Sequence, residues 1–463
     1  MLRCSLLTLS ALALPVAAQD PIRLSVQPAR SPQPALKFQL LPEIRDLKPG
    51  NAALLYQRAH SPEWYDVFRR SPDYPKVSEW IELPLDKLPV DRVNALLPRQ
   101  MLTEVDTAAR RASCDWDLTA RVRRDGFAMM LPEMQCFREF ATLLMLRARL
   151  EMRAGTLPAA IFSLQTGLGM ARHIAEGPTL IHGLVGAAIA NNMLGQIEEL
   201  VQQDGATNLY WALTDLPRPF VDMRRPLQAE KLMFESMVPG IRAAWKDPQL
   251  GPLPAEKLNR ELARVGTLLS IGDFSNRVYI AVAAARIYPE AKKYLIDQGY
   301  PAARADALPV IQVALMYSLA MYDVTYDDFY RWTNLPYWEA QPGLMRAEKQ
   351  LARAKQKIVH EGGIPVAEWL MPAVRKVLEA RVRVERRIAA LRCIEALRLH
   401  AADNQGAFPA KLADVKIAPI PIDPATGKSF EYRLEDYRAL LIGPGFAGER
   451  TGIRYELTLR SKS

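Results

Sequence analysis

Long segments of helical periodicity, separated by short glycine and proline breaks, dominate the chain from residue 97 to residue 362. In one of them Leu164, Leu168 and Ala171 recur at the spacing of a single helix face. The break before this segment reads RAGTLP, and Pro158 suits the first turn of a helix. Amphipathic helices of this kind must pack on one another to bury their apolar faces. The sequence therefore predicts an antiparallel array of helical hairpins, which makes the fold mainly α.

The pair of segments around Gly155 resembles a tetratricopeptide helix pair, over about one and a half units. The resemblance implies repeat-like hairpin packing without a particular ligand. The composition agrees with a large globular chain, since 49% of the 463 residues are hydrophobic and 24% are charged. Prolines number 35 against 24 glycines, as expected for many helix starts and stiff connections.

Four successive segments are expected along the chain. They are a signal peptide at 1–18, a proline-rich lead-in with the first helices at 19–96, an α-helical body at 97–362, and a long helix with a small antiparallel sheet at 363–463.

The N-terminus has the pattern of a secretory leader. Arg3 precedes an apolar run from Leu6 to Leu14, and Ala18 ends a small-residue cleavage site before Gln19. We therefore expect export to the periplasm or the medium. No later segment is apolar and long enough to predict a transmembrane span of the mature chain.

Three cysteines follow the leader, at positions 114, 136 and 393. In an oxidising compartment Cys114 and Cys136 are candidates for a disulfide. Cys136 also belongs to an apolar stripe at helical spacing, so a buried free thiol is the competing interpretation.

Acidic and aromatic side chains concentrate in the stretch 316–343, which we call the aromatic-acid stretch. Its carboxylates Asp323, Asp327 and Asp328 are candidate catalytic residues, because residues four apart share a helix face and paired carboxylates can divide acid and base roles. Aromatic platforms beside them suit sugar binding. The candidate binding residues are Tyr322, Tyr326, Tyr330 and Trp332. The alternative is that these rings pack between helices and the aspartates are solvated.

Sequence motifs for other chemistries are missing. We find no nucleophile elbow, phosphate loop, zinc helix or calcium loop, so no cofactor and no metal is predicted. His173 and His182 flank a turn but have no acidic ligand near them in sequence. The net charge of +9 is scattered, and no nucleic-acid module is recognised. The partner stays unknown, with a protein, an anionic glycan or a membrane surface as possibilities.

The last 80 residues resemble the soluble part of type II secretion pseudopilins and type IV pilins. In that family a long helix ends at Asp-Asn-Gly and an aromatic-proline pair, and an Asp-Pro turn leads into a small antiparallel sheet. The matching residues are Asp403, Asn404, Gly406, Phe408, Pro409, Asp423, Pro424, Gly427 and Tyr432. The resemblance implies an α+β module, with Phe408 buried and three strands within 429–459.

Charged residues stand where a pilin would have its membrane segment, among them Arg375, Lys376 and Glu379. They indicate a module reused as a soluble appendage. The chain as a whole also resembles a set of exported bacterial helical proteins of unknown activity, through the motifs LLPEIRD, PGNAALLYQRA and CDWDL. We expect a non-enzymatic scaffold or binding protein. The alternatives are a hydrolase acting on glycans or other substrates at the aromatic-acid stretch, and a secretion or pilus accessory protein.

Overall fold

The computed structural model describes residues 20–268, 277–360, 366–446 and 452–460. The predicted signal peptide lies outside these ranges. The described residues form 18 α-helices and a small sheet region near the C-terminus, so the prediction of a mainly α fold is confirmed. Contacts divide the chain into two units, each made of separated segments.

The larger unit contains residues Gln39–Gln196 and Leu216–Glu385. Its α-helices are α1 (Ala52–Ala59), α2 (Pro62–Arg69), α3 (Val77–Glu82), α4 (Val90–Leu96), α5 (Arg99–Ala109), α6 (Thr119–Asp125), α7 (Glu133–Arg153), α8 (Leu157–Ala175), α11 (Arg224–Met237), α12 (Pro239–Lys246), α13 (Ala255–Leu268), α14 (Arg277–Asp297), α15 (Ala302–Asp306), α16 (Val310–Tyr330) and α17 (Tyr337–His360). It also holds the greater part of α9 (Leu180–Leu200) and the first half of α18 (Val366–Asp403). Its strands are β2 (Lys48–Asn51) and β3 (Arg111–Ser113).

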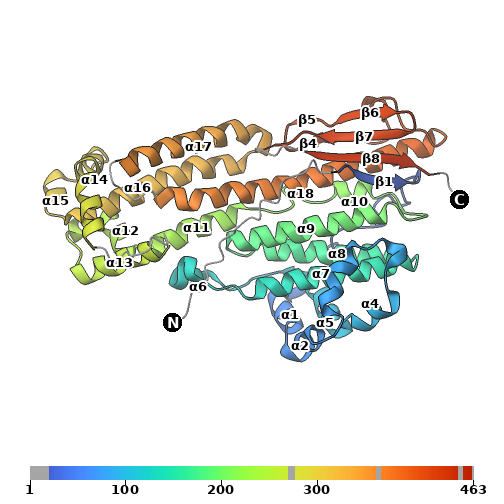
Figure 1. Cartoon of the computed structure of the whole chain (residues 1–463), viewed down its shortest axis with the longest axis horizontal. Helices are drawn as coiled ribbons and strands as arrows, with labels where there is room; N and C mark the ends of the chain where they lie inside the picture. Colours follow the sequence, from blue (N-terminus) through green and yellow to red (C-terminus); the bar gives the residue numbers. More distant parts are fainter. Residues whose placement is uncertain (1–19, 269–276, 361–365, 447–451, 461–463) are drawn as a thin grey trace. The chain divides into compact units, whose positions relative to one another are not determined.

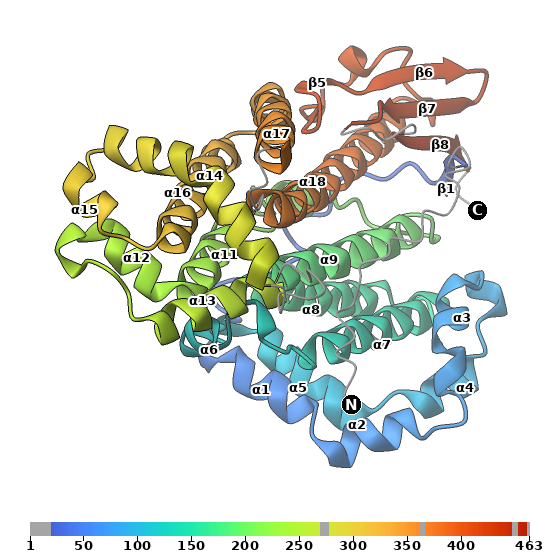
Figure 2. The same ribbon diagram turned by 60° about the vertical axis from the view of Figure 1, so that its left-hand side comes forward.

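Helices α7 and α8 form the hairpin that the sequence predicts. The break between them holds Gly155 at φ +72°, a left-handed conformation that glycine adopts without strain, and Pro158 stands in the first turn of α8. The two helices pack on each other, and α5 packs on α8. Helix α3 also packs on α7, and Figure 2 shows α3 near one end of that helix.

Two distant sequence motifs meet at the start of α1. The side chain of Asn51 accepts a hydrogen bond from the N–H of Ala53, which caps the helix, and a second from the N–H of Asp115 at 2.9 Å. Its amide donates to the carbonyl of Asp115 at 2.7 Å. The parallel pairing of β2 with β3 lies beside this contact, so Asn51 joins PGNAALLYQRA to CDWDL.

The smaller unit contains residues 1–38, Ile197–Asp215 and 386–463. Its elements are β1 (Ile22–Val26), α10 (Tyr210–Thr214), the second half of α18, β4 (Ile422–Asp423), β5 (Lys428–Ser429), β6 (Glu431–Glu435), β7 (Arg438–Gly443) and β8 (Ile453–Leu459). One sheet has the strand order β1-β8-β7-β6, as Figure 1 shows, and β4 pairs with β5 in a short hairpin. Strands β6, β7 and β8 are antiparallel, whereas β1 joins β8 in parallel.

The C-terminal helix ends close to the predicted point. Helix α18 stops at Asp403, and Gly406 has φ +79°, where a residue with a Cβ would be strained. Phe408 is buried, and three antiparallel strands follow within 429–459. The parallel strand β1 makes the sheet mixed, a feature absent from the antiparallel sheet expected from the sequence. The pilin-like identity of this region stays a prediction.

A buried ion pair fixes the second half of α18. Arg398 and Glu395 are fully buried and lie 2.8 Å apart. The guanidinium of Arg398 also donates to the carbonyls of Gln27 and Ala206, at 2.9 and 2.7 Å. The carboxylate of Glu395 accepts the N–H of Leu209. One charge pair therefore links all three segments of the smaller unit.

The cysteines of the described residues are free and buried, so the structure does not contain the candidate disulfide between Cys114 and Cys136. Burial raises the pKa of both thiols, as expected for thiols packed in apolar surroundings. Among the described helices, none is long and apolar enough to cross a membrane.

Candidate functional site

A cavity of about 460 Å³ opens between α4, α5, α7 and the start of α8. Its lining combines aliphatic side chains with polar and charged ones. The lining residues are Val90, Asn94, Leu97, Arg99, Leu102, Thr103, Arg147, Leu150, Glu151, Ala154 and Thr156. We call this the charged cavity. Its volume falls in the range of small-molecule sites, which is roughly 300 to 1,000 Å³.

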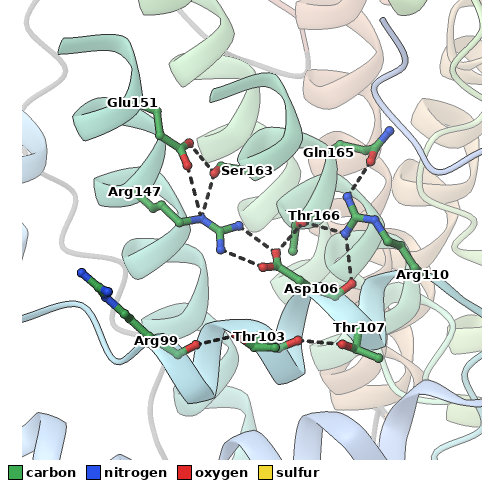
Figure 3. Close-up of polar contacts among 10 residues, drawn as sticks. All are labelled: Arg99, Thr103, Asp106, Thr107, Arg110, Arg147, Glu151, Ser163, Gln165 and Thr166. Atoms are coloured by element: carbon green, nitrogen blue, oxygen red, sulfur yellow. Dashed lines mark hydrogen bonds and ion pairs between the residues drawn. The ribbon is translucent and has the colours of Figure 1, made fainter. Parts of the chain in front are cut away.

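Arg147 is held in one orientation at the wall of the charged cavity. Its guanidinium forms two parallel hydrogen bonds to the carboxylate of Asp106, at 2.8 and 2.7 Å. Its Nε donates to the hydroxyl of Ser163 at 2.8 Å, and that hydroxyl donates to Glu151. Figure 3 shows these residues converging from α5, α7 and α8. Bidentate pairing and packing leave Arg147 little freedom, so the wall is preorganised.

A second arginine, Arg110, is connected to Asp106 through the Thr166 hydroxyl. Arg110 donates to Thr166 at 3.0 Å, and the Thr166 hydroxyl donates to Asp106 at 2.8 Å. The amide oxygen of Gln165 accepts from Arg110 at 2.6 Å. The Arg110 guanidinium also stacks on the ring of Phe162, 3.8 Å from its centroid. Burial lowers the pKa of Arg110, because the charged form loses solvent.

Glu151 and Arg99 complete the charges of the lining. Burial raises the pKa of Glu151 above its ordinary value, although the Ser163 hydroxyl and Arg147 favour the ionised form. Arg99 is exposed, and in Figure 3 its guanidinium extends away from Asp106 and contacts none of the other residues drawn. The cavity thus offers a fixed polar wall, an aliphatic surface and a cation that can reach an incoming anion.

No sequence motif predicts this site. Arg147 and Glu151 stand four residues apart on α7, and Arg99, Thr103 and Asp106 follow a polar face of α5. This spacing of polar residues on one helix face was the available sequence signal for the site. It is weak, because such pairs are common on solvated helix faces.

The aromatic-acid stretch lies on α16 and the turn after it. Asp323 is paired with Arg242 in two hydrogen bonds, one of them 2.9 Å long, and Lys231 lies 3.9 Å away. Asp328 is paired with Arg331 at 2.8 Å. Asp327 is mostly exposed and lies 3.3 Å from Lys231. Two of the three candidate carboxylates are therefore neutralised by arginine.

The aromatic candidates divide into two groups. Tyr326 and Tyr330 stack with centroids 5.4 Å apart, and with Asp327 and Lys231 they line a cavity of about 310 Å³. Tyr322 is fully buried against Phe234. The ring of Trp332 does not line this cavity and contacts two arginines instead. Only part of the predicted aromatic platform is thus brought together.

The two histidines beside the α8–α9 turn are buried separately. His173 Nδ1 lies 3.1 Å from the Tyr56 hydroxyl, and His182 Nδ1 lies 2.7 Å from the Thr179 hydroxyl. Burial lowers the pKa of each histidine to about 4. Within the described ranges, no group of three or more potential ligands is arranged to hold a metal ion.

Comparison with known proteins gives no further assignment. No family model, no curated protein and no solved structure matches this chain.

Proposed function

We propose that this chain is an exported, non-enzymatic helical binding protein, and that the charged cavity receives its ligand. The observation that carries the proposal is the cavity of about 460 Å³ whose lining combines Arg99, an arginine without an ion pair among the described residues, with the paired Arg147 and Glu151. The ligand is a small amphipathic molecule, with an apolar body against the leucines and one anionic group at Arg99. Arg147 is already neutralised by Asp106, so it orients the ligand rather than supplying net charge.

A direct binding measurement tests this function. Octanoate is the probe and octanol is its uncharged analogue, with titration calorimetry as the readout. Arg99→Gln is expected to weaken octanoate binding about tenfold, as a lost charge-assisted hydrogen bond implies, and to leave any octanol binding unchanged. The exposed Arg123 on α6 provides the matched control Arg123→Gln.

A second pair of variants tests the place of binding. Ala154→Phe puts a ring into the charged cavity from the C-cap of α7 and should abolish binding of octanoate. Ala307→Phe makes the same change at the exposed C-cap of α15 and should have no effect. Undiminished binding to folded Ala154→Phe would contradict the assignment of the cavity.

A glycan-binding function at the aromatic-acid stretch is the second candidate. The stacked Tyr326 and Tyr330 beside Asp327 favour it, because flat aromatic faces next to a carboxylate suit sugar rings and hydroxyls. The arginine pairs on Asp323 and Asp328 favour binding over hydrolysis. Saturation-transfer NMR with short oligosaccharides tests it, and loss of the signal in Tyr330→Ala is the expected result.

A role as a secretion or pilus accessory is the remaining alternative. Its support is the order of helix, Gly406, Phe408 and antiparallel strands, which agrees with the pilin resemblance. A filament role needs an exposed long helix, and α18 is buried over most of the stretch from Val377 to Ala401.

The proposed export is tested by measuring the intact mass of the protein, since a chain processed as proposed begins at Gln19.

A further inference from the structure

A third cavity, of about 220 Å³, lies beside the N-terminal half of α7 and belongs to none of the sites described above. Its lining comes from the end of α2, the turn before α3, α3 itself and α7. We call it the Glu139 cavity. Its lining includes Phe68, Tyr74, Gln135, Arg138, Glu139 and Thr142.

The carboxylate of Glu139 is the unusual feature of this cavity. Only 7% of the residue is exposed. Its Oε1 accepts hydrogen bonds from the Tyr74 hydroxyl at 2.9 Å and from the Gln135 amide at 3.4 Å. The Tyr65 hydroxyl also lies close enough to interact with this carboxylate, but Oε2 is buried and no described residue donates to it in hydrogen-bonding geometry. A buried acceptor without a donor costs free energy, and more so when it carries charge.

The surroundings supply positive charge only at a distance. The Arg69 guanidinium lies over the rings of Tyr65 and Tyr74, 5.5 and 5.6 Å from their centroids. Arg138 also lines the cavity, but it is exposed to solvent. In the part of the chain that the structure describes, neither arginine forms an ion pair with Glu139. The carboxylate therefore lacks the partner that a buried charge requires.

We propose that the Glu139 cavity binds a primary alkylammonium group, with the ammonium donating to Oε2 of Glu139 and the alkyl chain lying against Phe68 and Tyr74. An ammonium supplies both missing elements, a hydrogen-bond donor and a positive charge. Aromatic walls are favourable for a cation that has left water. The small volume admits a chain of about four carbons, which fits either a free alkylamine or the side chain of a lysine.

The probes are n-butylammonium, tetramethylammonium, n-butanol and N-acetyl-lysine methylamide, each titrated calorimetrically into the full-length protein. n-Butylammonium should bind at least tenfold more tightly than tetramethylammonium, which has no N–H donor, and n-butanol should not bind. Binding of the lysine derivative as tightly as n-butylammonium would identify a protein side chain as the source, and weaker binding would identify a free amine. Equal affinity for tetramethylammonium, or no binding of any ammonium, would overturn the proposal.

Variants locate the binding on Glu139. Glu139→Gln should weaken n-butylammonium binding at least tenfold, and it should abolish the rise in melting temperature that the amine produces in the unmodified protein. Glu133→Gln is the matched control, since Glu133 is also on α7 and does not line the cavity. Should Glu139→Gln fail to fold, Thr142→Phe fills the cavity while keeping the carboxylate. Undiminished binding to either folded variant would overturn the proposal.

Discussion

Arg398 donates to Glu395 across 2.8 Å in a site from which solvent is excluded for both side chains. Burial raises the pKa of Glu395, and the adjacent guanidinium opposes that rise. Arg398→Ala would leave the carboxylate buried without its counter-charge. We expect a loss of about 3 to 5 kcal/mol in the free energy of unfolding, as for other broken buried pairs.

Urea denaturation measures this loss, and Arg433→Ala is the control. Arg433 forms an exposed pair with Glu431, so its removal should cost less than about 1 kcal/mol. Similar losses in the two variants would contradict the role given to Arg398.

Phe408 should act as an anchor for the end of α18. Its ring is buried, and Phe408→Ala is expected to cost about 3 kcal/mol from lost burial and the cavity left behind. Hydrogen exchange reports the effect by segment. Amides of β6 to β8 should exchange faster, whereas those of the α7–α8 hairpin should keep their protection. Uniform loss of protection along the chain would show that the effect is not local.

The pH dependence of stability should carry a contribution from Glu230 on α11. Burial raises its pKa from 4.5 to about 7. Between these values the folded state binds more protons than the unfolded state, so the contribution of Glu230 to the free energy of unfolding falls as pH rises from 4.5 to 7.

His173 and His182 have the opposite effect. Their pKa in the folded protein is about 4, below the ordinary 6.5, so their contribution to the free energy of unfolding is lost as pH falls from 6.5 to 4.

Glu230→Gln separates the two effects. The difference in unfolding free energy between this variant and the unmodified protein should grow in favour of the variant from pH 4.5 to 7. Glu256→Gln, which removes an exposed carboxylate, is the control for the loss of one surface charge. A flat difference for Glu230→Gln would show that its carboxyl titrates normally.

The double variant Asp327→Asn, Asp328→Asn tests the aromatic-acid stretch. Asp327 is mostly exposed, and the partner of Asp328 is an exposed arginine. We expect the free energy of unfolding to change by about 1 kcal/mol or less, and octanoate binding at the charged cavity to stay unchanged. A large loss of any activity or sugar binding in the folded double variant would favour the second candidate function.

Local signals in the sequence predicted where helices begin and end better than they predicted which helices pack together. The Gly155 break and Pro158 were sufficient for the α7–α8 hairpin, and Gly406 for the end of α18, because turn chemistry depends on adjacent residues. The charged cavity was missed, since Asp106 meets Arg147 only after α5 packs beside α7. Which helices pack together depends on side-chain shape across the whole unit, and periodicity does not report it.

The same limit applies to Asn51 and Asp115. Each belongs to a motif that carries the resemblance to exported helical proteins, and the structure joins the two motifs through hydrogen bonds between Asn51 and Asp115. A single sequence does not show that these two positions are neighbours in the folded protein. The aromatic-acid stretch shows the opposite error. Its aromatic residues are close in sequence, which suggested a single binding platform, but helix geometry points them to different surroundings.

The pairing of β1 with β8 has a consequence for biosynthesis. These are the first and last strands of the described chain, and residues Ile22 to Val26 find their register only on residues Tyr455 to Leu459. A ribosome releases β1 long before β8 exists, so this sheet closes only after residues 453–459 have been made. A product that terminates before β8 would leave β1 unpaired on both of its edges. Such an unpaired strand is a target for proteases and aggregation, so the sheet distinguishes chains that contain β8 from chains that lack it.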